Sequence, residues 1–178
     1  MLERNLFAGF GGQGMLLIGQ FLALAGMEEG KHVAWLPSYG PEMRGGTANC
    51  SVTVSDKEIA SPIINSPDCV IAMNLPSLDK FEETVRPGGL LIINSDLIER
   101  KAKRDDVEVV YVKANTIAEE IGNPKGANVV ILGAYLAKKP IVTIDSMMAA
   151  IEHKLGAKKA RFLEGNKKAL LAGMEAAK

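Results

Sequence analysis

The chain has 178 residues, 47% of them hydrophobic, and its 21 basic side chains balance 21 acidic ones. Without net charge the protein has no field that would attract nucleic acid or an anionic membrane surface, so neither is expected as a partner. We also expect a cytoplasmic location, because the first residues lack a signal-peptide pattern and the apolar runs end well short of the roughly 20 residues that span a bilayer.

Candidate catalytic and metal-ligating residues are scarce. Cys50 and Cys69 stand far apart and outside any C-x-x-C pair, so we predict buried, inert thiols rather than zinc or iron–sulfur ligands. His32 and His153 are isolated, and surface or capping roles fit them better. The chain has no G-x-S-x-G turn, Walker lysine or His-x-x-x-His pair. We therefore predict no catalytic residue and no metal site. This set of side chains is better suited to binding and positioning a ligand or a partner than to catalysis.

The most informative stretch is a glycine turn near the start of the chain. A short apolar strand at 6–8 enters the turn, and a helix is expected over about 13–28. The glycines follow the pattern G-x-G-x-x-G: Gly9, Gly11 and Gly14. In this strand–turn–helix context the pattern predicts a phosphate site, because glycines let a ligand approach the backbone and the first helical N–H groups attract anions. The alternative is that the glycines only permit close packing.

Two further observations bear on that turn. Gln13 is a polar amide at its tip, which can hydrogen-bond a ligand or a partner backbone. The acid that would bind a dinucleotide ribose is missing, since the strand at 32–36 and its surroundings hold none before Glu42. NAD therefore loses its most specific contact. The helix between them is apolar on nearly every face, which predicts burial, and Gly30 is its expected C-terminal cap.

The segment 37–46 is the second informative stretch. Its two prolines and three glycines argue against a regular element, yet it carries Tyr39, Glu42 and Arg44. Loops held on a rigid scaffold commonly supply binding residues. A well-packed surface loop with two surface charges explains the same composition, and both interpretations stay open.

The strand patterns predict a mixed sheet. Residues 47–54 alternate strictly between apolar and polar, so one face should lie in the core while the other meets water, a ligand or a partner. Residues 69–73 and 90–93 are continuously apolar, as in strands that helices cover on both faces. A last strand is expected at 107–112.

The later chain is rich in helices. The expected segments are a helix at 77–85, a solvated connection at 101–106, a short helix from a capping Asn115 to Ile121, a helix at 128–138, a helix from a capping Asp145 to Leu155, and a final helix at 158–177. Residues 94–96 follow a strand, where they could bind a ligand or cap a helix. The pattern predicts a single Rossmann-like, three-layer α/β domain over residues 1–178, with a mixed, mostly parallel sheet and a helix-rich C-terminal part.

Both informative stretches, in this order, resemble the gamma subunit of the 2-oxoacid:ferredoxin oxidoreductases. The resemblance rests on residues 9–14 with the apolar helix behind them and on residues 38–50, and it covers essentially the whole chain. Ser61-Pro62, Gly122-Asn123, Asn128 and Leu132-Gly133 also fit. The form of the second stretch is closer to 2-oxoglutarate and branched-chain members than to pyruvate members.

The resemblance implies a subunit of a complex that oxidatively decarboxylates a 2-oxoacid, transfers the acyl group to coenzyme A and passes two electrons to ferredoxin. Thiamine diphosphate with magnesium and the iron–sulfur clusters would be held by alpha, beta and ferredoxin-like delta subunits, so none would be bound by this chain alone. Carried over by position, the glycine turn (Gly9, Gly11, Gly12, Gln13 and Gly14) would form an anion site for a coenzyme A phosphate. Tyr39, Glu42, Arg44 and Thr47 would lie at the subunit junction near the reaction centre.

Two other functions remain open at this stage. One is a stand-alone nucleotide-binding oxidoreductase that uses the glycine turn for NAD or FAD, against which the missing acid argues. The other is a non-catalytic interaction module in which the turn only packs. Failure to bind any phosphate-bearing ligand would favour the second.

Overall fold

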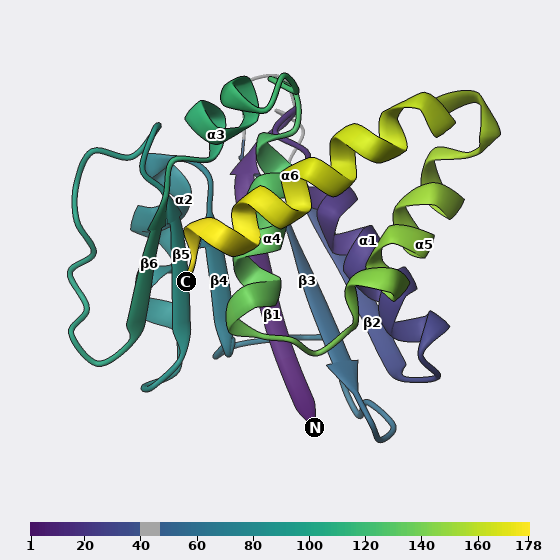
Figure 1. The fold of residues 1–178 in the computed structure, drawn as a ribbon. Coiled ribbons are helices and arrows are strands. Elements are labelled where there is room, and N and C mark those ends of the chain that lie inside the picture. Colours follow the sequence, from purple (N-terminus) through teal and green to yellow (C-terminus); the bar gives the residue numbers. More distant parts are fainter. Residues whose placement is uncertain (40–46) are drawn as a thin grey trace.

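The computed structural model describes residues 1–39 and 47–178. A six-stranded sheet in the order β2-β3-β1-β4-β5-β6 runs through the domain (Figure 1). Its strands are β1 (Leu2–Phe10), β2 (His32–Tyr39), β3 (Thr47–Ser55), β4 (Cys69–Ala72), β5 (Leu90–Asn94) and β6 (Glu108–Val112). β1, β4, β5 and β6 are parallel, whereas β3 is antiparallel to both of its neighbours. The predicted mixed, mostly parallel sheet is confirmed.

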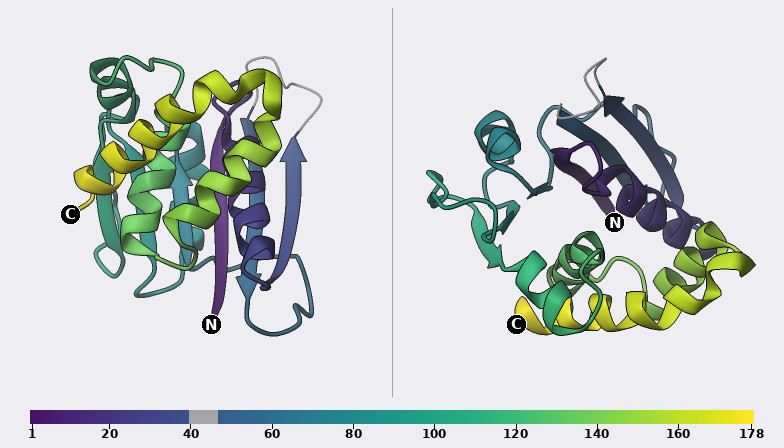
Figure 2. Two further views of the ribbon diagram at one scale, coloured as in Figure 1. Left: turned by 45° about the vertical axis from the view of Figure 1, so that its right-hand side comes forward. Right: turned by 90° about the horizontal axis from the view of Figure 1, so that it is seen from above.

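Helices cover the two faces of this sheet unequally (Figure 2). The helical segments are α1 (Met15–Glu28), α2 (Leu75–Phe81), η1 (Glu82–Thr84), α3 (Ala114–Glu120), α4 (Ala127–Lys138), α5 (Ile144–Leu155), η2 (Ala157–Phe162) and α6 (Leu163–Ala176). The larger core lies between one face and the helices α1, α3, α4, α5 and α6, and the smaller core lies under α2. The helix-rich C-terminal part is therefore confirmed, and most of it packs on a single face.

The apolar helix α4 is held between the sheet and α6. Its Tyr135 is fully buried and meets Phe7 of β1 edge-on, with ring centroids 5.7 Å apart. On the other side the α4 and α6 backbones touch, since a Cβ on Gly173 would lie 1.7 Å from the Val130 carbonyl oxygen. Close packing on both sides fixes the position of the amino end of α4 relative to the sheet.

The alternating strand β3 behaves as predicted on its apolar side. Cys50, Val52 and Val54 are completely buried in the larger core. The opposite side carries polar residues, and there Asn49 and Ser51 are half-buried whereas Thr53 is buried. The polar face is thus only partly open to water or a partner.

Strand β2 is longer than predicted. It continues through Pro37 and Ser38 to Tyr39, where the proline and glycine content indicated a loop. Pro37 is tolerated because β2 is an edge strand, which does not need every backbone N–H for pairing. The remaining loop residues, including Glu42 and Arg44, lie outside the described residues.

Two predicted helix caps are wrong. Asn115 lies inside α3, whose first N–H groups donate instead to Asn94 at the end of β5 and to Asp96 in the β5–β6 connection. Asp145 lies in the first turn of α5, and Thr143 is the capping residue. The cap of α5 therefore lies two positions from the predicted residue, whereas α3 is capped by residues that are distant in sequence. For residues 94–96, the structure assigns the capping role.

Three other boundaries differ from the prediction. The helix predicted at 77–85 begins at Leu75, after an Asn74 cap that accepts from the Ser77 N–H, and becomes a 3-10 turn at Glu82. The final α-helix starts only at Leu163, after a 3-10 turn. The C-terminal end of α1 is as predicted, because Gly30 and Lys31 donate to the Met27 and Gly26 carbonyls.

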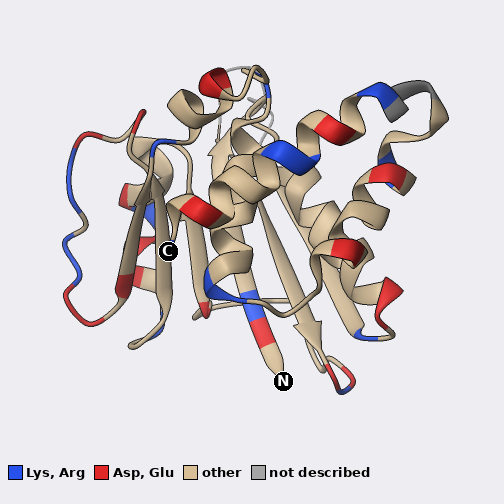
Figure 3. Ribbon diagram, in the orientation of Figure 1, with Lys and Arg blue, Asp and Glu red and all other residues tan. Residues whose placement is uncertain are grey.

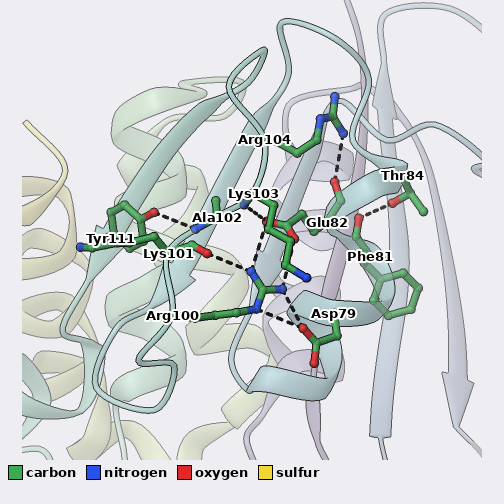
Figure 4. Close-up of polar contacts among 10 residues, drawn as sticks. All are labelled: Asp79, Phe81, Glu82, Thr84, Arg100, Lys101, Ala102, Lys103, Arg104 and Tyr111. Carbon is green, nitrogen blue, oxygen red and sulfur yellow. Dashed lines mark hydrogen bonds and ion pairs between the residues drawn. The ribbon is translucent and has the colours of Figure 1, made fainter.

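The connection at 101–106 is largely exposed, as its charges predicted, and only Ala102 and Arg104 in it are half-buried. Its basic residues come before its acidic ones (Figure 3), and its backbone is tied to the buried carboxylate of Glu82. Glu82 accepts from Arg100 at 3.1 Å and from the Lys103 N–H at 2.6 Å, and Arg104 donates to the Glu82 carbonyl (Figure 4). Tyr111 accepts from the Ala102 N–H. Backbone N–H groups and the Arg104 side chain thus hold this exposed segment over the smaller core.

Candidate functional site

The glycine turn lies at the switch point of the sheet, where two neighbouring parallel strands are followed by helices on opposite faces. From the carboxyl end of β1 the chain passes through α1 on one face, and from the end of the adjacent β4 it passes through α2 on the other. In open α/β sheets this switch point forms a crevice that commonly binds a ligand. The Asn74 amide on the β4 side reaches Gln13 Oε1 on the β1 side at 3.4 Å. The structure therefore puts the turn at the expected place for a site.

Gln13 shapes the turn from inside. Its Oε1 accepts a hydrogen bond from the Phe10 N–H at 2.6 Å in addition to the Asn74 contact. A Cβ on Gly9 would lie 2.6 Å from the same oxygen, so Gly9 provides the space for the amide. The carbonyl oxygen of Gln13 is thus occupied within the protein, and only the NH₂ end remains as a donor for a ligand.

Gly12 and Gly14 are glycines for different structural reasons. Gly12 has a φ of 92° and open space around it, so only its left-handed backbone conformation favours glycine there. Gly14 has a φ of 77°, and in addition a Cβ there would lie 2.3 Å from Asn128 Nδ2. Asn128 belongs to the first turn of α4 and donates to the Gly14 carbonyl at 3.3 Å. The close approach at Gly14 therefore brings the amino ends of α1 and α4 together.

Neither of these helix ends has a capping side chain at the residue before the helix, which is Gly14 for α1 and Gly126 for α4, and neither first turn holds an acidic residue. In the first turn of α4 one N–H group, that of Val129, donates to the Asn128 side chain at 3.0 Å. The first α1 hydrogen bond runs from the Ile18 N–H to the Gly14 carbonyl, so the three N–H groups before it have no partner within the helix. Two adjacent, uncapped amino termini make this edge of the sheet electropositive and suited to an anion.

The other predicted site residues fall at the same edge as far as they are described. Thr47 opens β3 and is paired with Phe10, the last residue of β1. The backbone of Tyr39 pairs with Ala48 next to it. Both ends of the segment that contains Glu42 and Arg44 thus lie beside the glycine turn. Asn74 was missed, although an Asn directly after an apolar strand and before Leu-Pro is a recognisable helix start.

The cysteines are buried as predicted. Burial raises the pKa of the Cys50 thiol to about 12 and that of Cys69 well above its usual range. Both thiols are therefore protonated at neutral pH and unreactive. Over residues 1–39 and 47–178, no group of three or more His, Cys, Asp or Glu side chains could hold a metal ion, and no helix could cross a membrane.

Comparison with known proteins identifies the family. Residues 4–176 match the family described as pyruvate ferredoxin/flavodoxin oxidoreductase. The chain belongs to this family. Within it, the chain is 35% identical over 154 residues to the 2-oxoglutarate synthase subunit KorC of Methanocaldococcus jannaschii, which covers 85% of this chain and 82% of that subunit.

Two further oxidoreductase-family comparisons add detail. Ketoisovalerate oxidoreductase subunit VorA of Methanothermobacter marburgensis is 42% identical over 134 residues, which is 75% of this chain but only 28% of VorA. The keto/oxoacid ferredoxin oxidoreductase gamma subunit of Geobacter sulfurreducens superposes with a TM-score of 0.83 at 31% identity, covering 98% of each chain. The predicted membership of the gamma-type family and the predicted fold are thus confirmed.

Proposed function

We propose that this chain is the gamma-type subunit of a 2-oxoacid:ferredoxin oxidoreductase. The complex would oxidatively decarboxylate a 2-oxoacid, transfer the acyl group to coenzyme A and reduce ferredoxin. The names of the relatives favour 2-oxoglutarate or a branched-chain 2-oxoacid as the substrate. Thiamine-binding alpha and beta subunits and a ferredoxin-like delta subunit are the proposed partners, and they would hold thiamine diphosphate, magnesium and the iron–sulfur clusters. The protonated, buried thiols of Cys50 and Cys69 fit such a division.

The observation that carries the role of this chain is the open amino end of α1 at the switch point. The backbone N–H groups that precede the first α1 hydrogen bond would bind a phosphate of coenzyme A, with Gly11 and Gly12 leaving the approach free of side chains. Bound coenzyme A would supply the thiol that takes the acyl group. Gln13 would hold the turn in shape and offer its NH₂ group to the ligand.

The residues that flank the turn would face the catalytic subunits. Thr47 opens a strand directly beside the turn, and Tyr39 ends the neighbouring strand. We place Glu42 and Arg44 at the same subunit junction by their position between these two. Arg44 would pair with a phosphate or a carboxylate there, because a guanidinium binds such groups through two parallel hydrogen bonds.

The assembly is tested by isolating this subunit with its partners from the native source. Mass spectrometry of the eluate should identify thiamine-binding and ferredoxin-like chains. The same eluate should reduce a viologen when a 2-oxoacid and coenzyme A are both added. A chain that elutes alone and is inactive with every 2-oxoacid would contradict the proposal.

The coenzyme A role is tested by placing a negative charge at the tip of the turn. In the assembled complex, Gly12→Asp should raise the KM for coenzyme A about tenfold or more, because the new carboxylate would repel the phosphate of coenzyme A. The KM for the 2-oxoacid should stay unchanged. Gly88→Asp is the matched control, because Gly88 also has a positive φ, at 77°, and open surroundings but lies before β5, at the opposite ends of the strands. Equal effects of the two variants would remove the claim.

A further inference from the structure

A groove next to the glycine turn has no role in the function proposed above. It has a volume of about 760 Å³, which is within the usual range of ligand pockets. Its walls come from the first half of α1, the turn before α4, the end of α5, and the junction of η2 with α6. Figure 1 shows the turn from α5 into α6 at the upper right. One wall is apolar and the other carries amides and cations. Leu17 and Phe21 lie on the apolar side, and Asn123, Lys125 and Arg161 lie on the polar side.

The charge of this groove distinguishes it from the other hollows of the described surface. Its lining contains Lys125 and Arg161 and, among the described residues, no Asp or Glu. Each of the four other hollows includes at least one carboxylate. The groove is therefore the one in this set that favours an anion.

Arg161 is also exceptional among the arginines. The four others in the described stretches pair with carboxylates: Arg4 and Arg86 with Asp68, Arg100 with Asp79 and Glu82, and Arg104 with Asp106. Arg161 has no such partner there, and neither has Lys125. Because the fold pairs its other guanidinium groups, an unpaired one at the rim of a groove is available for a ligand anion.

An aromatic ring stands beside these cations. Phe162 is 47% exposed, and the Arg161 guanidinium lies 4.7 Å from the centre of its ring. The guanidinium lies over the ring as a cation–π pair, and such a planar pair is a platform on which a nucleobase can stack. The amino end of α4 opens onto the same groove through Asn128 and Val129. The Val129 N–H donates to Asn128 Oδ1, and the end of the helix, which has no acidic residue in its first turn, adds to the positive potential.

We propose that this groove binds a nucleoside phosphate, with the base on Phe162 and the phosphate between Lys125, Arg161 and the amino end of α4. The combination of a ring platform, amide groups and unpaired cations fits that ligand class. A partner protein chain would be expected to bring carboxylates to the cations, but nothing in the groove requires an extended backbone. If the nucleoside phosphate is the end of coenzyme A, the inference rests on the proposed function, whereas a free nucleotide would make it a separate effector site.

The test is calorimetric titration of the full chain with adenosine 3′,5′-bisphosphate. Saturable binding is expected, and Arg161→Gln, Lys125→Gln and Phe162→Ala should each weaken it about tenfold or more. Lys167→Gln is the matched control, because Lys167 is an exposed α6 lysine outside the groove. Unchanged thermal midpoints would show that the variants fold. Competition by coenzyme A but not by ADP would identify coenzyme A as the source, and competition by both would identify free nucleotides.

Several results would overturn the proposal. These are the absence of saturable binding at millimolar ligand, equal binding by all four variants, or equal affinity for plain adenosine or for inorganic phosphate. The outcome is separate from that of the proposed function. An active complex whose gamma-type chain binds no nucleotide in this groove would refute the groove alone, and nucleotide binding by a chain that joins no complex would refute the proposed function alone.

Discussion

The amino ends of the first five α-helices, α1 to α5, fall into two groups. Those of α2, α3 and α5 are closed by side chains from outside the helix that accept their first N–H groups: Asn74, Asn94 with Asp96, and Thr143. Those of α1 and α4 have no such cap and no acidic first turn, although Asn128 of α4 accepts from the Val129 N–H, and they meet at one edge of the sheet. The domain thus leaves the positive amino ends of two helices without a charged or external capping side chain where a ligand crevice is expected. The N–H groups at these helix ends therefore locate the site better than the glycines alone.

Breaking a closed end should have the largest effect on stability. Asn94 is fully buried, accepts from the Ala114 N–H at 3.2 Å and donates to Asn115 at 2.8 Å. Asn94→Ala removes a helix cap and leaves its hydrogen-bond partners unsatisfied in the interior. We therefore expect a loss of about 3 kcal/mol in the free energy of unfolding, measured by urea denaturation. The half-buried neighbour Ser95 is the control. A loss no larger than that of Ser95→Ala would show that α3 does not depend on this cap.

Crowding the open end is the next test. Gly14→Ala places a Cβ in the left-handed region and against Asn128, so we expect a loss of about 2 kcal/mol. Gly12→Ala has the same backbone problem in open space and should lose about 1 kcal/mol. The difference in urea midpoint between the two variants measures the contact between α1 and α4. Equal losses would mean that Asn128 moves away freely.

A smaller, pH-dependent effect is expected at the amino end of α5. Burial acts to raise the pKa of Glu29, but hydrogen bonds from Lys31 and from the Thr143 N–H outweigh it and lower that pKa to about 2. The folded pKa lies below the unfolded value of 4.5, so the carboxylate stabilises the protein above that pH. This contribution is lost as the pH falls from there towards 2.

The corresponding variant is Glu29→Gln. At pH 7 it should lower the free energy of unfolding by about 1 kcal/mol, because it replaces charged hydrogen bonds at a partly exposed site. Urea denaturation across the acid range should show the two proteins converging near the folded pKa. A difference that stays constant with pH would mean that ionisation of Glu29 is not involved.

The elements were predictable where burial alone decides them. The apolar runs that became α4 and β5 lie in the core on every side, so their composition was sufficient. The helix caps were not predictable in the same way, because α3 is capped by Asn94 and Asp96, which are distant in sequence, rather than by its own Asn115. The hydrogen bond between the Lys103 N–H and Glu82 was not predictable either, since Glu82 is distant in sequence from the connection at 101–106.

The candidate site was predictable only in part. The glycine turn carries a local pattern, and the structure puts it at the switch point of the sheet. Gln13 was expected to bond either a ligand or a backbone group, and which of the two its oxygen bonds depends on the turn geometry. The groove has no local signal, because Phe21 and Arg161 come from opposite ends of the chain and meet only after folding.

The substitution of Lys125 should change the stability least and the binding of a nucleoside phosphate most clearly. Lys125 is exposed and directly precedes Gly126, the residue before the first turn of α4. In Lys125→Glu a negative charge faces the positive helix end, so the free energy of unfolding should rise by about 0.3–0.5 kcal/mol, whereas nucleoside phosphate binding should be lost. Urea denaturation and calorimetric titration of the same preparation measure both, with Lys125→Gln as the uncharged reference. Opposite signs would mean that this helix end is left open for a ligand at the expense of stability, and a variant that loses both would mean that Lys125 is needed for folding instead.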